Sequence, residues 1–309
     1  MSLKIIFMGT PEFAVPALQI LVEHDYHIVG VITSPDRLGG RGRKTVIESD
    51  VKKYAISQGL NVLQPTNLKN KDFLKELQAL EADVQIVVAF RMLPVAVWDM
   101  PAYGTYNLHG SLLPAYRGAA PINWAIIRGE RITGVTSFKL KHEIDTGDML
   151  FQESLDILTT DNASDVHDRM KILGAKVILQ TIQAVENDTV QLIAQDNSKV
   201  SKAPKINKEI CKINFAQATH KVYNMIRGLS LYPAAWCKID GKTTKLIKVT
   251  MFRDGLERMA GKIFTDNKTR MCISTIDGYI HIQKLQQEGK RRMDIQDFLN
   301  GYTIESTQL

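Results

Sequence analysis

An asparagine and a histidine two positions apart, Asn107 and His109, have side chains that together could carry out chemistry. They lie in the segment 105–118, which predicts a strand running into a rigid turn. Side chains two positions apart on a strand project from the same face. The asparagine amide donates a hydrogen bond and histidine can carry a proton near neutral pH, so the pair could stabilise an oxyanion in acyl transfer. A purely structural polar pair at a strand end is the alternative.

A third candidate, Asp145, follows a later predicted strand, in the segment 142–148 that reads HEIDTGD. Its three acidic residues lack the regular ligand spacing of an EF-hand, and no metal site is predicted. Ordinary turn chemistry would account for the segment. The functional interpretation is that the Asp145 carboxylate reaches His109 and fixes its protonation state.

The elements that must position these residues begin with a βαβ unit. Residues 4–8 form a short apolar run that ends at Gly9-Thr10-Pro11, which predicts a strand followed by a helix over 11–23 with Thr10 as its N-cap. A second strand is predicted over 27–33, so we expect a parallel sheet. Only Gly9 stands where a G-x-G-x-x-G motif would be needed, which argues against NAD binding.

The α/β alternation continues and predicts a Rossmann-like parallel-sheet domain over residues 1–189. Such a sheet binds ligands at the carboxyl ends of its strands, where Asn107 and His109 are placed. The further helices are predicted over 51–58, 72–80, 120–128 and 164–186, and the further strands over 61–63, 84–89 and 134–140.

The C-terminal part is predicted to be a separate small domain. Residues 190–209 are polar, contain several lysines and a proline, and are interpreted as a linker. In 210–309 one helix, 215–229, precedes five short strands bounded by turn sequences, which favours a small OB-like β-barrel. These strands are predicted over 236–239, 245–250, 262–264, 271–274 and 279–285.

Charge is divided unevenly along the chain. Residues 1–189 carry a formal charge of −3 and residues 190–309 carry +9. A cationic domain attracts polyanions, although a merely soluble surface is the alternative.

The three cysteines are scattered and are interpreted as reduced and structural. The apolar start is too short for a signal peptide and no later run could span a membrane, so we expect a cytoplasmic protein that does not bind membranes.

The sequence resembles the methionyl-tRNA formyltransferase family over essentially its whole length. Five ordered motifs carry this resemblance: GTPEFA at 9–14, SPDR at 34–37 with GRGRK at 40–44, NLHGSLLP at 107–114, DTGD at 145–148 and APKI at 203–206.

The resemblance implies that 10-formyltetrahydrofolate is the formyl donor and that the α-amino group of methionine on initiator tRNA is the acceptor. Asn107 and His109 would stabilise the oxyanion, and His109 would supply a proton to the departing folate nitrogen. Asp145 would be the third catalytic residue. The turn that borders the folate in this family corresponds to Ser111, Leu112, Leu113 and Pro114. No metal is expected.

The same resemblance implies a tRNA-binding loop after the second strand. Its cations stand among glycines, as suits a loop that folds onto RNA, and Arg41 is the strongest candidate among them. A solvated surface loop is the alternative. With the linker lysine, the predicted tRNA-binding residues are Arg37, Arg41, Arg43, Lys44 and Lys205.

The segment that departs from the family pattern is 90–92, Phe-Arg-Met, which is shorter than the usual Tyr-Gly-containing stretch and could alter the wall of the folate pocket. Amino-sugar formyltransferases share the Asn-x-His pair and the aspartate, so they remain an alternative function. A tRNA-binding module without catalysis is a second one. The basic loop and the basic C-terminal part favour tRNA as acceptor, and a two-domain monomer would suffice.

Overall fold

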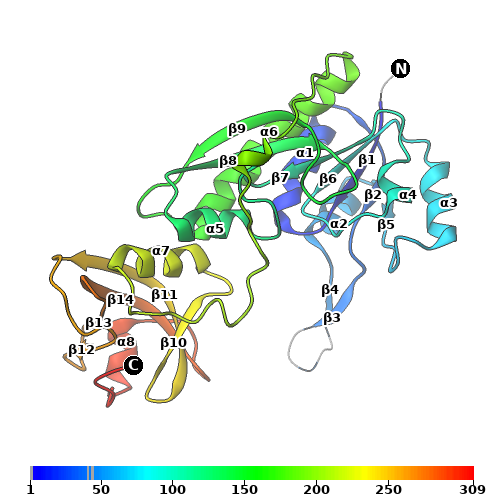
Figure 1. Ribbon diagram of the computed structural model, residues 1–309. Coiled ribbons are helices and arrows are strands. Elements are labelled where there is room, and N and C mark those ends of the chain that lie inside the picture. Colours follow the sequence, from blue (N-terminus) through cyan, green and yellow to red (C-terminus); the bar gives the residue numbers. More distant parts are fainter. Residues whose placement is uncertain (1–2, 40–41, 43–44) are drawn as a thin grey trace. The chain divides into compact units, whose positions relative to one another are not determined.

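The computed structural model describes residues 3–39, 42 and 45–309, which group into two compact units (Figure 1). Unit 1 takes its described residues from Met1–Gly118, Gly134–Leu155 and His167–Lys202. Unit 2 consists of Ala119–Thr133, Asp156–Val166 and Ala203–Leu309. Both units are therefore discontinuous in sequence.

Unit 1 is built on a seven-stranded sheet of order β5-β2-β1-β6-β7-β8-β9. The pairs from β5 to β7 are parallel, as predicted. At one edge of the sheet β8 runs antiparallel to β7, a direction that no signal in the sequence indicated. The strands are β1 (Lys4–Gly9), β2 (His27–Ile32), β5 (Val62–Leu63), β6 (Val84–Val88), β7 (Thr105–His109), β8 (Ile132–Lys139) and β9 (Met149–Asp156).

Burial explains why the central strands read as continuous apolar runs. All five residues of β6 are buried, as expected for a parallel strand covered on both faces. One core cluster joins Ile6 and Met8 of β1 to Phe73 and Leu77 of a neighbouring helix. Most of α6 (Ala163–Glu186) also belongs to unit 1, although its first turn belongs to unit 2. The other helical elements of unit 1 are η1 (Glu12–Ala14), α1 (Val15–Glu23), α2 (Asp50–Ser57), α3 (Lys71–Ala79), α4 (Val95–Trp98) and η2 (Asn197–Lys199).

The predicted N-cap at Thr10 is wrong. The Thr10 hydroxyl lies 2.9 Å from the Ser34 hydroxyl, and the helical segment starts with a 3-10 turn whose N-cap is Pro11, without a side-chain cap. The two hydroxyls follow β1 and β2, so their hydrogen bond ties together the carboxyl ends of neighbouring strands. Side-chain caps occur instead at α2, where Ser49 Oγ accepts from the Lys52 amide, and at α3, where Asn70 is the cap.

A short antiparallel hairpin, β3 (Arg37–Gly39) and β4 (Thr45–Ile47), follows β2 and was not predicted. It is light blue in Figure 1. Its apolar side chains Leu38 and Val46 are exposed, so the hairpin is not held by a core of its own.

Unit 2 contains α5 (Pro121–Arg128), α7 (Thr219–Leu229) and an antiparallel sheet of order β10-β11-β14-β13-β12, with β15 on β14. Bulges between Leu246 and Val249 bend β11, and the sheet curls as half of a barrel. The predicted fold class is confirmed: a Rossmann-like domain and a small β domain. The remaining elements are β10 (Ala235–Ile239), β11 (Lys242–Arg253), β12 (Ile263–Thr265), β13 (Met271–Ser274), β14 (Gly278–Gln287), β15 (Met293–Asp294) and α8 (Ile295–Asn300).

The helix α7 covers the curled sheet with Val222, Ile226 and Leu229, which share one core cluster with residues of β11, β13 and β14. Its first turn is held by Asp277, which comes from the turn before β14. Asp277 Oδ1 accepts hydrogen bonds from the Thr219 amide and the Thr219 hydroxyl, each at 2.7 Å. Among the described residues, no helix is both long and apolar enough to cross a membrane.

Candidate active site

The carboxyl end of β7 presents Asn107 and His109. From β1 the chain adds β2 and then β5 on one side of β1, and later adds β6 on its other side. The strand order therefore reverses between β1 and β6. In α/β sheets, ligands bind at the carboxyl ends of the strands at such a reversal, the topological switch point. Strand β7 pairs with β6 through Val87 and Asn107. The candidate pair therefore lies one strand from the switch point, on the edge that the sequence predicted.

The imidazole of His109 is buried and oriented by a backbone carbonyl. Its Nε2 lies 2.9 Å from the Tyr116 carbonyl oxygen. Because a carbonyl only accepts, Nε2 must carry the proton and donate it. The other nitrogen, Nδ1, lies 3.9 Å from Asp145 Oδ2, which is too long for a direct hydrogen bond. In this geometry the Tyr116 carbonyl sets the tautomer of His109, whereas the sequence interpretation gave that role to Asp145.

The position of the Asp145 carboxylate depends on a hydrogen bond to its side chain and on an unusual backbone conformation. Its Oδ2 accepts a hydrogen bond of 2.9 Å from the Gly118 amide. Its backbone adopts φ +55°, a left-handed conformation that non-glycine residues seldom adopt, and Tyr116 does the same at +62°. Oδ2 of Asp145, while bonded to the Gly118 amide, lies 3.9 Å from Nδ1 of His109.

The loop of Asp145 closes tightly on β8. A Cβ atom on Gly147 would lie 1.8 Å from the Lys139 carbonyl oxygen, so only glycine fits at this position of the Asp-Thr-Gly-Asp motif. The Lys139 amide also donates to the Asp148 carbonyl at 2.9 Å. The backbone around Asp145 is thereby held in place.

Gln195 is a residue of the site that the sequence analysis missed. Its Nε2 donates to the carbonyl oxygens of Asp145, at 2.9 Å, and Gly147, at 2.7 Å. Its Oε1 accepts from Nε and Nη2 of Arg117, at 3.0 and 2.6 Å. Gln195 therefore links the Asp145 loop to the segment that carries Tyr116. No sequence signal pointed to it, because it lies in the polar stretch interpreted as a linker.

The turn 111–114 is preformed by hydrogen bonds from β8 and β9. Thr136 Oγ1 accepts from the Leu113 amide at 3.0 Å and donates to the Ser111 carbonyl at 2.7 Å. Gln152 donates to the Leu113 carbonyl at 2.7 Å. Ser111 and Leu113 are buried, whereas Leu112 and Pro114 are half-buried. The turn is a rigid wall on which Leu112 and Pro114 keep exposed surface.

The amide of Asn107 is half-buried and stays available. In the part of the chain that the structure describes, its side chain makes no hydrogen bond, including with His109 or Asp145. The structure thus brings His109 and Asp145 together, and places Asn107 on the same strand as His109 with an unused donor.

The structure describes two of the predicted tRNA-binding residues, Arg37 and Lys205. Arg37 is exposed on β3, and Lys205 is exposed in unit 2. Arg41, Arg43 and Lys44 lie outside the described residues.

The arginine of the unusual segment 90–92 has a structural role. Arg91 donates to the carbonyl of Thr66 at 3.0 Å and to that of Pro65, and its guanidinium lies 5.6 Å from the Phe90 ring centroid. Burial lowers the pKa of this guanidinium. Arg91 ties its segment to the chain after β5.

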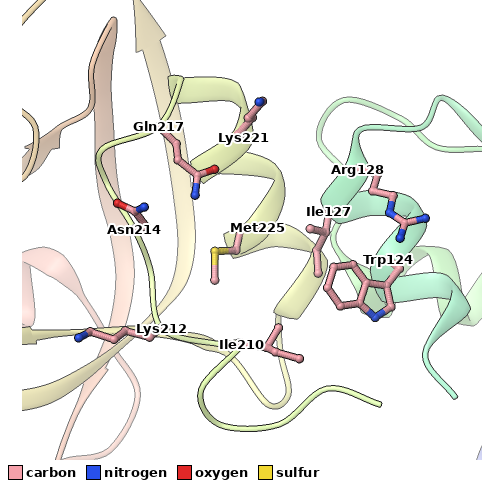
Figure 2. Close-up of a pocket in the computed structure, with 9 residues that line it drawn as sticks. All are labelled: Trp124, Ile127, Arg128, Ile210, Lys212, Asn214, Gln217, Lys221 and Met225. Atoms are coloured by element: carbon pink, nitrogen blue, oxygen red, sulfur yellow. The ribbon is translucent and has the colours of Figure 1, made fainter. Parts of the chain in front are cut away.

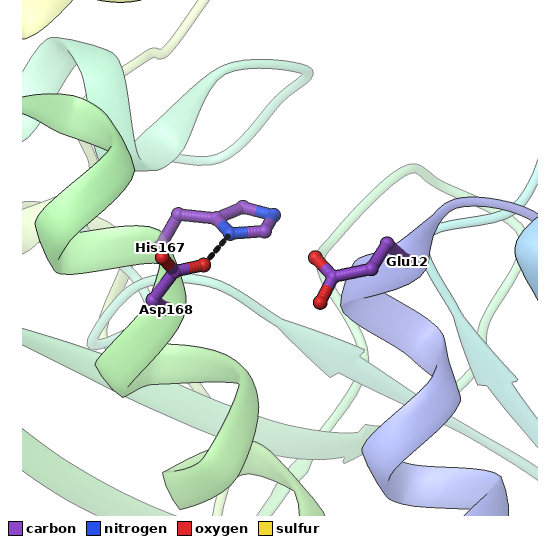
Figure 3. A group of neighbouring side chains, drawn as sticks. All are labelled: Glu12, His167 and Asp168. Carbon is purple, nitrogen blue, oxygen red and sulfur yellow. Dashed lines mark hydrogen bonds and ion pairs between the residues drawn. The ribbon is translucent and has the colours of Figure 1, made fainter.

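One group of side chains in unit 1 has the composition of a metal site, namely Glu12, His167 and Asp168 (Figure 3). Lys171 already supplies a cation there, because its ammonium bonds Glu12 and lies 3.1 Å from Asp168. The hydrogen bond from His167 and the lysine lower the pKa of Asp168. The group is explained as a charge-balanced contact between η1 and α6.

Comparison with known proteins defines the class. Residues 3–182 match the family described as "Formyl transferase", and residues 205–303 match "Formyl transferase, C-terminal domain". Fold and site thus define a formyl-transferring enzyme.

The relatives narrow this class. The methionyl-tRNA formyltransferase of Bacteroides thetaiotaomicron is 47% identical over 312 residues, covering 98% of this chain and 97% of the relative. That of Flavobacterium johnsoniae is 47% identical over 308 residues, with the same coverage. The chain belongs to the methionyl-tRNA formyltransferase family, and the resemblance stated from its motifs is confirmed.

Solved structures share the fold at lower identity. An N-formyltransferase from Helicobacter canadensis, in complex with folinic acid and dTDP-3-aminofucose, has a TM-score of 0.69 and 23% identity, covering 92% of this chain and 99% of that one. HypX from Aquifex aeolicus, in complex with tetrahydrofolic acid, has a TM-score of 0.67 and 19% identity, covering 97% of this chain and 48% of that one.

Proposed function

We propose that this protein transfers the formyl group of 10-formyltetrahydrofolate to the α-amino group of methionine carried by initiator tRNA. The observation that carries the mechanism is the 3.9 Å separation between His109 Nδ1 and Asp145 Oδ2, with both groups anchored from outside the pair. The folate carries its formyl group on a nitrogen atom, and the amine attacks the carbon of that formyl group.

The residues divide the work of this acyl transfer. When the amine attacks, it gives up a proton, which Asp145 accepts directly or through a water molecule. That proton passes on from Asp145 to Nδ1 of His109, and the negative oxygen of the tetrahedral intermediate is stabilised by the Asn107 amide and the resulting imidazolium. His109 then gives a proton to the departing folate nitrogen. Because Nε2 is engaged with the Tyr116 carbonyl, Nδ1 is the atom that exchanges this proton.

Substrate contacts are proposed at residues outside the catalytic group. The turn of Ser111, Leu112, Leu113 and Pro114 borders the folate, since its backbone is held rigid and part of its apolar surface stays exposed. Phosphates of the tRNA contact five cations. These are Arg37, Arg41, Arg43, Lys44 and Lys205.

The same proposal assigns roles to the chain segments. The formyltransferase domain comprises residues 1–189, and a linker over 190–209 joins it to the C-terminal domain, 210–309. The C-terminal domain has a positive formal charge and binds tRNA together with the linker. The protein works in the cytoplasm, where translation starts, as a monomer without a metal.

The test supplies purified protein with 10-formyltetrahydrofolate and two acceptors in parallel, initiator tRNA charged with methionine and a dTDP-linked amino sugar. Mass spectrometry of the products is expected to find N-formylmethionine after ester hydrolysis and no formylated sugar. A formylated sugar without N-formylmethionine would replace the proposal with the amino-sugar alternative.

A further inference from the structure

Unit 2 contains a pocket of about 500 Å³ between α5, α7 and the segment 210–217 (Figure 2). Every residue that lines it belongs to unit 2. None is among the single residues proposed for catalysis, folate binding or tRNA binding, although those from 210 onward lie in the segment proposed to bind tRNA. The volume is in the range of small-molecule sites. The pocket is therefore a candidate ligand site separate from the catalytic residues.

The walls of the pocket are fixed by close packing of the two helices. Asn123 of α5 donates a hydrogen bond of 2.7 Å to the Gly228 carbonyl of α7. A Cβ atom on Gly228 would lie 2.8 Å from the Ile127 side chain, so the helices approach as closely as glycine allows. The pocket is thus formed before any ligand binds.

The interior is apolar and has one aromatic surface. Figure 2 shows Trp124 and Ile127 of α5 on one side and Met225 of α7 on the other. The Trp124 ring is held in place because its Nε1 donates to the Pro204 carbonyl at 2.8 Å. The Arg128 guanidinium lies 5.6 Å from the ring centroid of Trp124. The ring is thus held in one orientation and offers a flat surface to a ligand in the pocket.

The rim is cationic. Arg128, Lys212 and Lys221 line the pocket and no carboxylate does. Within the described ranges, neither lysine forms an ion pair. Asn214 Oδ1 accepts from the Ala216 amide, which leaves its NH₂ group to donate elsewhere. A ligand that fits must combine a flat apolar face, hydrogen-bonding edges and negative charge.

We propose that this pocket binds a nucleotide, with its base on Trp124 and its phosphate at Lys212, Lys221 and Arg128. Nucleotides combine the three required properties, and stacking on an aromatic ring accepts every base. The nucleotide is either free or an unpaired residue of an RNA chain. The proposal goes beyond formyl transfer and requires no formyl donor.

The test measures binding in the absence of folate, so that it reads independently of catalysis. The full chain is titrated with each of the four 5′-ribonucleotides by calorimetry, and with a fluorescent single-stranded RNA octamer by anisotropy. Trp124→Leu keeps apolar volume but removes the stacking surface, whereas Trp124→Phe keeps a ring. Lys212→Ala and Lys221→Ala test the rim, and Lys268→Ala, an exposed lysine that does not line the pocket, is the matched control.

Saturable binding is expected, weakened roughly tenfold or more by Trp124→Leu and about threefold or less by Trp124→Phe. Each rim variant should lower the salt dependence of RNA binding by about one phosphate contact, and Lys268→Ala should not. If the octamer binds and the free nucleotides do not, the ligand is an unpaired residue of an RNA chain. If the free nucleotides bind as tightly as the octamer, the ligand is the free nucleotide. Equal affinity for parent and Trp124→Leu, with thermal melting showing both folded, would overturn the proposal, as would binding of neither probe.

Discussion

The Tyr116 carbonyl accepts a hydrogen bond from Nε2 of His109 and so selects the nitrogen through which this histidine can exchange a proton. The free nitrogen, Nδ1, faces Asp145 across 3.9 Å. Asp145 is in turn anchored by the Gly118 amide, two residues after Tyr116. One short segment of backbone, 116–118, thus positions both ionisable groups of the site.

Replacing Asn107 by alanine removes the unused amide donor beside His109. If that amide stabilises the oxyanion, kcat should fall by about 10² to 10³, the usual effect of removing one such donor. The KM values for donor and acceptor should change little, because the interaction forms only in the transition state. Steady-state kinetics with charged initiator tRNA measure both. A raised KM with unchanged kcat would assign Asn107 to substrate binding instead.

Gln195→Leu should slow catalysis, although no substrate contact is proposed for Gln195. The substitution removes both hydrogen bonds that hold the carbonyls of Asp145 and Gly147, so the backbone that carries the Asp145 carboxylate is held less firmly, although Oδ2 still accepts from the Gly118 amide. We expect kcat to fall by about tenfold, since small misplacements of catalytic groups are costly, while KM and the melting temperature stay close to those of the parent.

The matched control for this experiment is Gln183→Leu, which changes an exposed glutamine on α6. It should retain the kcat of the parent. Equal kcat for Gln195→Leu and Gln183→Leu would show that the contact between Gln195 and the Asp145 loop has no role in positioning.

Acid should destabilise unit 2 through Asp277. Hydrogen bonds from the Thr219 amide and hydroxyl, together with Arg253, lower the pKa of this carboxyl. A lowered folded-state pKa contributes stability above the unfolded value of about 3.9, and this contribution is lost as pH falls through the folded-state pKa. Asp277→Asn should therefore lower the melting temperature at pH 7 and flatten its decline below about pH 4. An unchanged acid profile would contradict the role of Asp277 at α7.

Cys237 should resist alkylation in the folded protein. Burial raises the pKa of its thiol to about 12, so at pH 8 very little of it is the reactive thiolate. Cys272, which is only half-buried, is the internal comparison. Mass spectrometry after iodoacetamide treatment should find Cys272 modified before Cys237, and both modified in urea. Early labelling of Cys237 would show that the β10 region opens readily.

Sequence patterns predicted the fold well where one local signal determines the element. The apolar run before Gly9 and the turn sequences after 239 and 276 mark strands that the structure contains. The antiparallel edge at β8 escaped prediction, since strand direction depends on a partner distant in the chain. The N-cap at Thr10 was wrong because its hydroxyl bonds Ser34, whose proximity depends on the sheet.

The candidate site was predictable only in part. Asn107, His109 and Asp145 have side chains whose chemistry is visible in the sequence. The Tyr116 carbonyl is a backbone group, which every residue has, so no residue type could reveal it. Gln195 acts on Asp145 from 50 positions away and in a polar stretch without periodicity. What the sequence could not supply is the backbone geometry that orients the catalytic side chains.

Single-turnover formylation of charged initiator tRNA by Asp145→Asn, His109→Ala and the double variant tests the central claim most directly. If the two residues act as one proton-transfer unit, each single variant should lose about 10²-fold or more in rate, and the double variant should be scarcely slower than the slower single one. Retained tRNA affinity in a binding assay would show that the acceptor still docks. A parental rate in either single variant, or fully multiplicative losses in the double variant, would contradict the account.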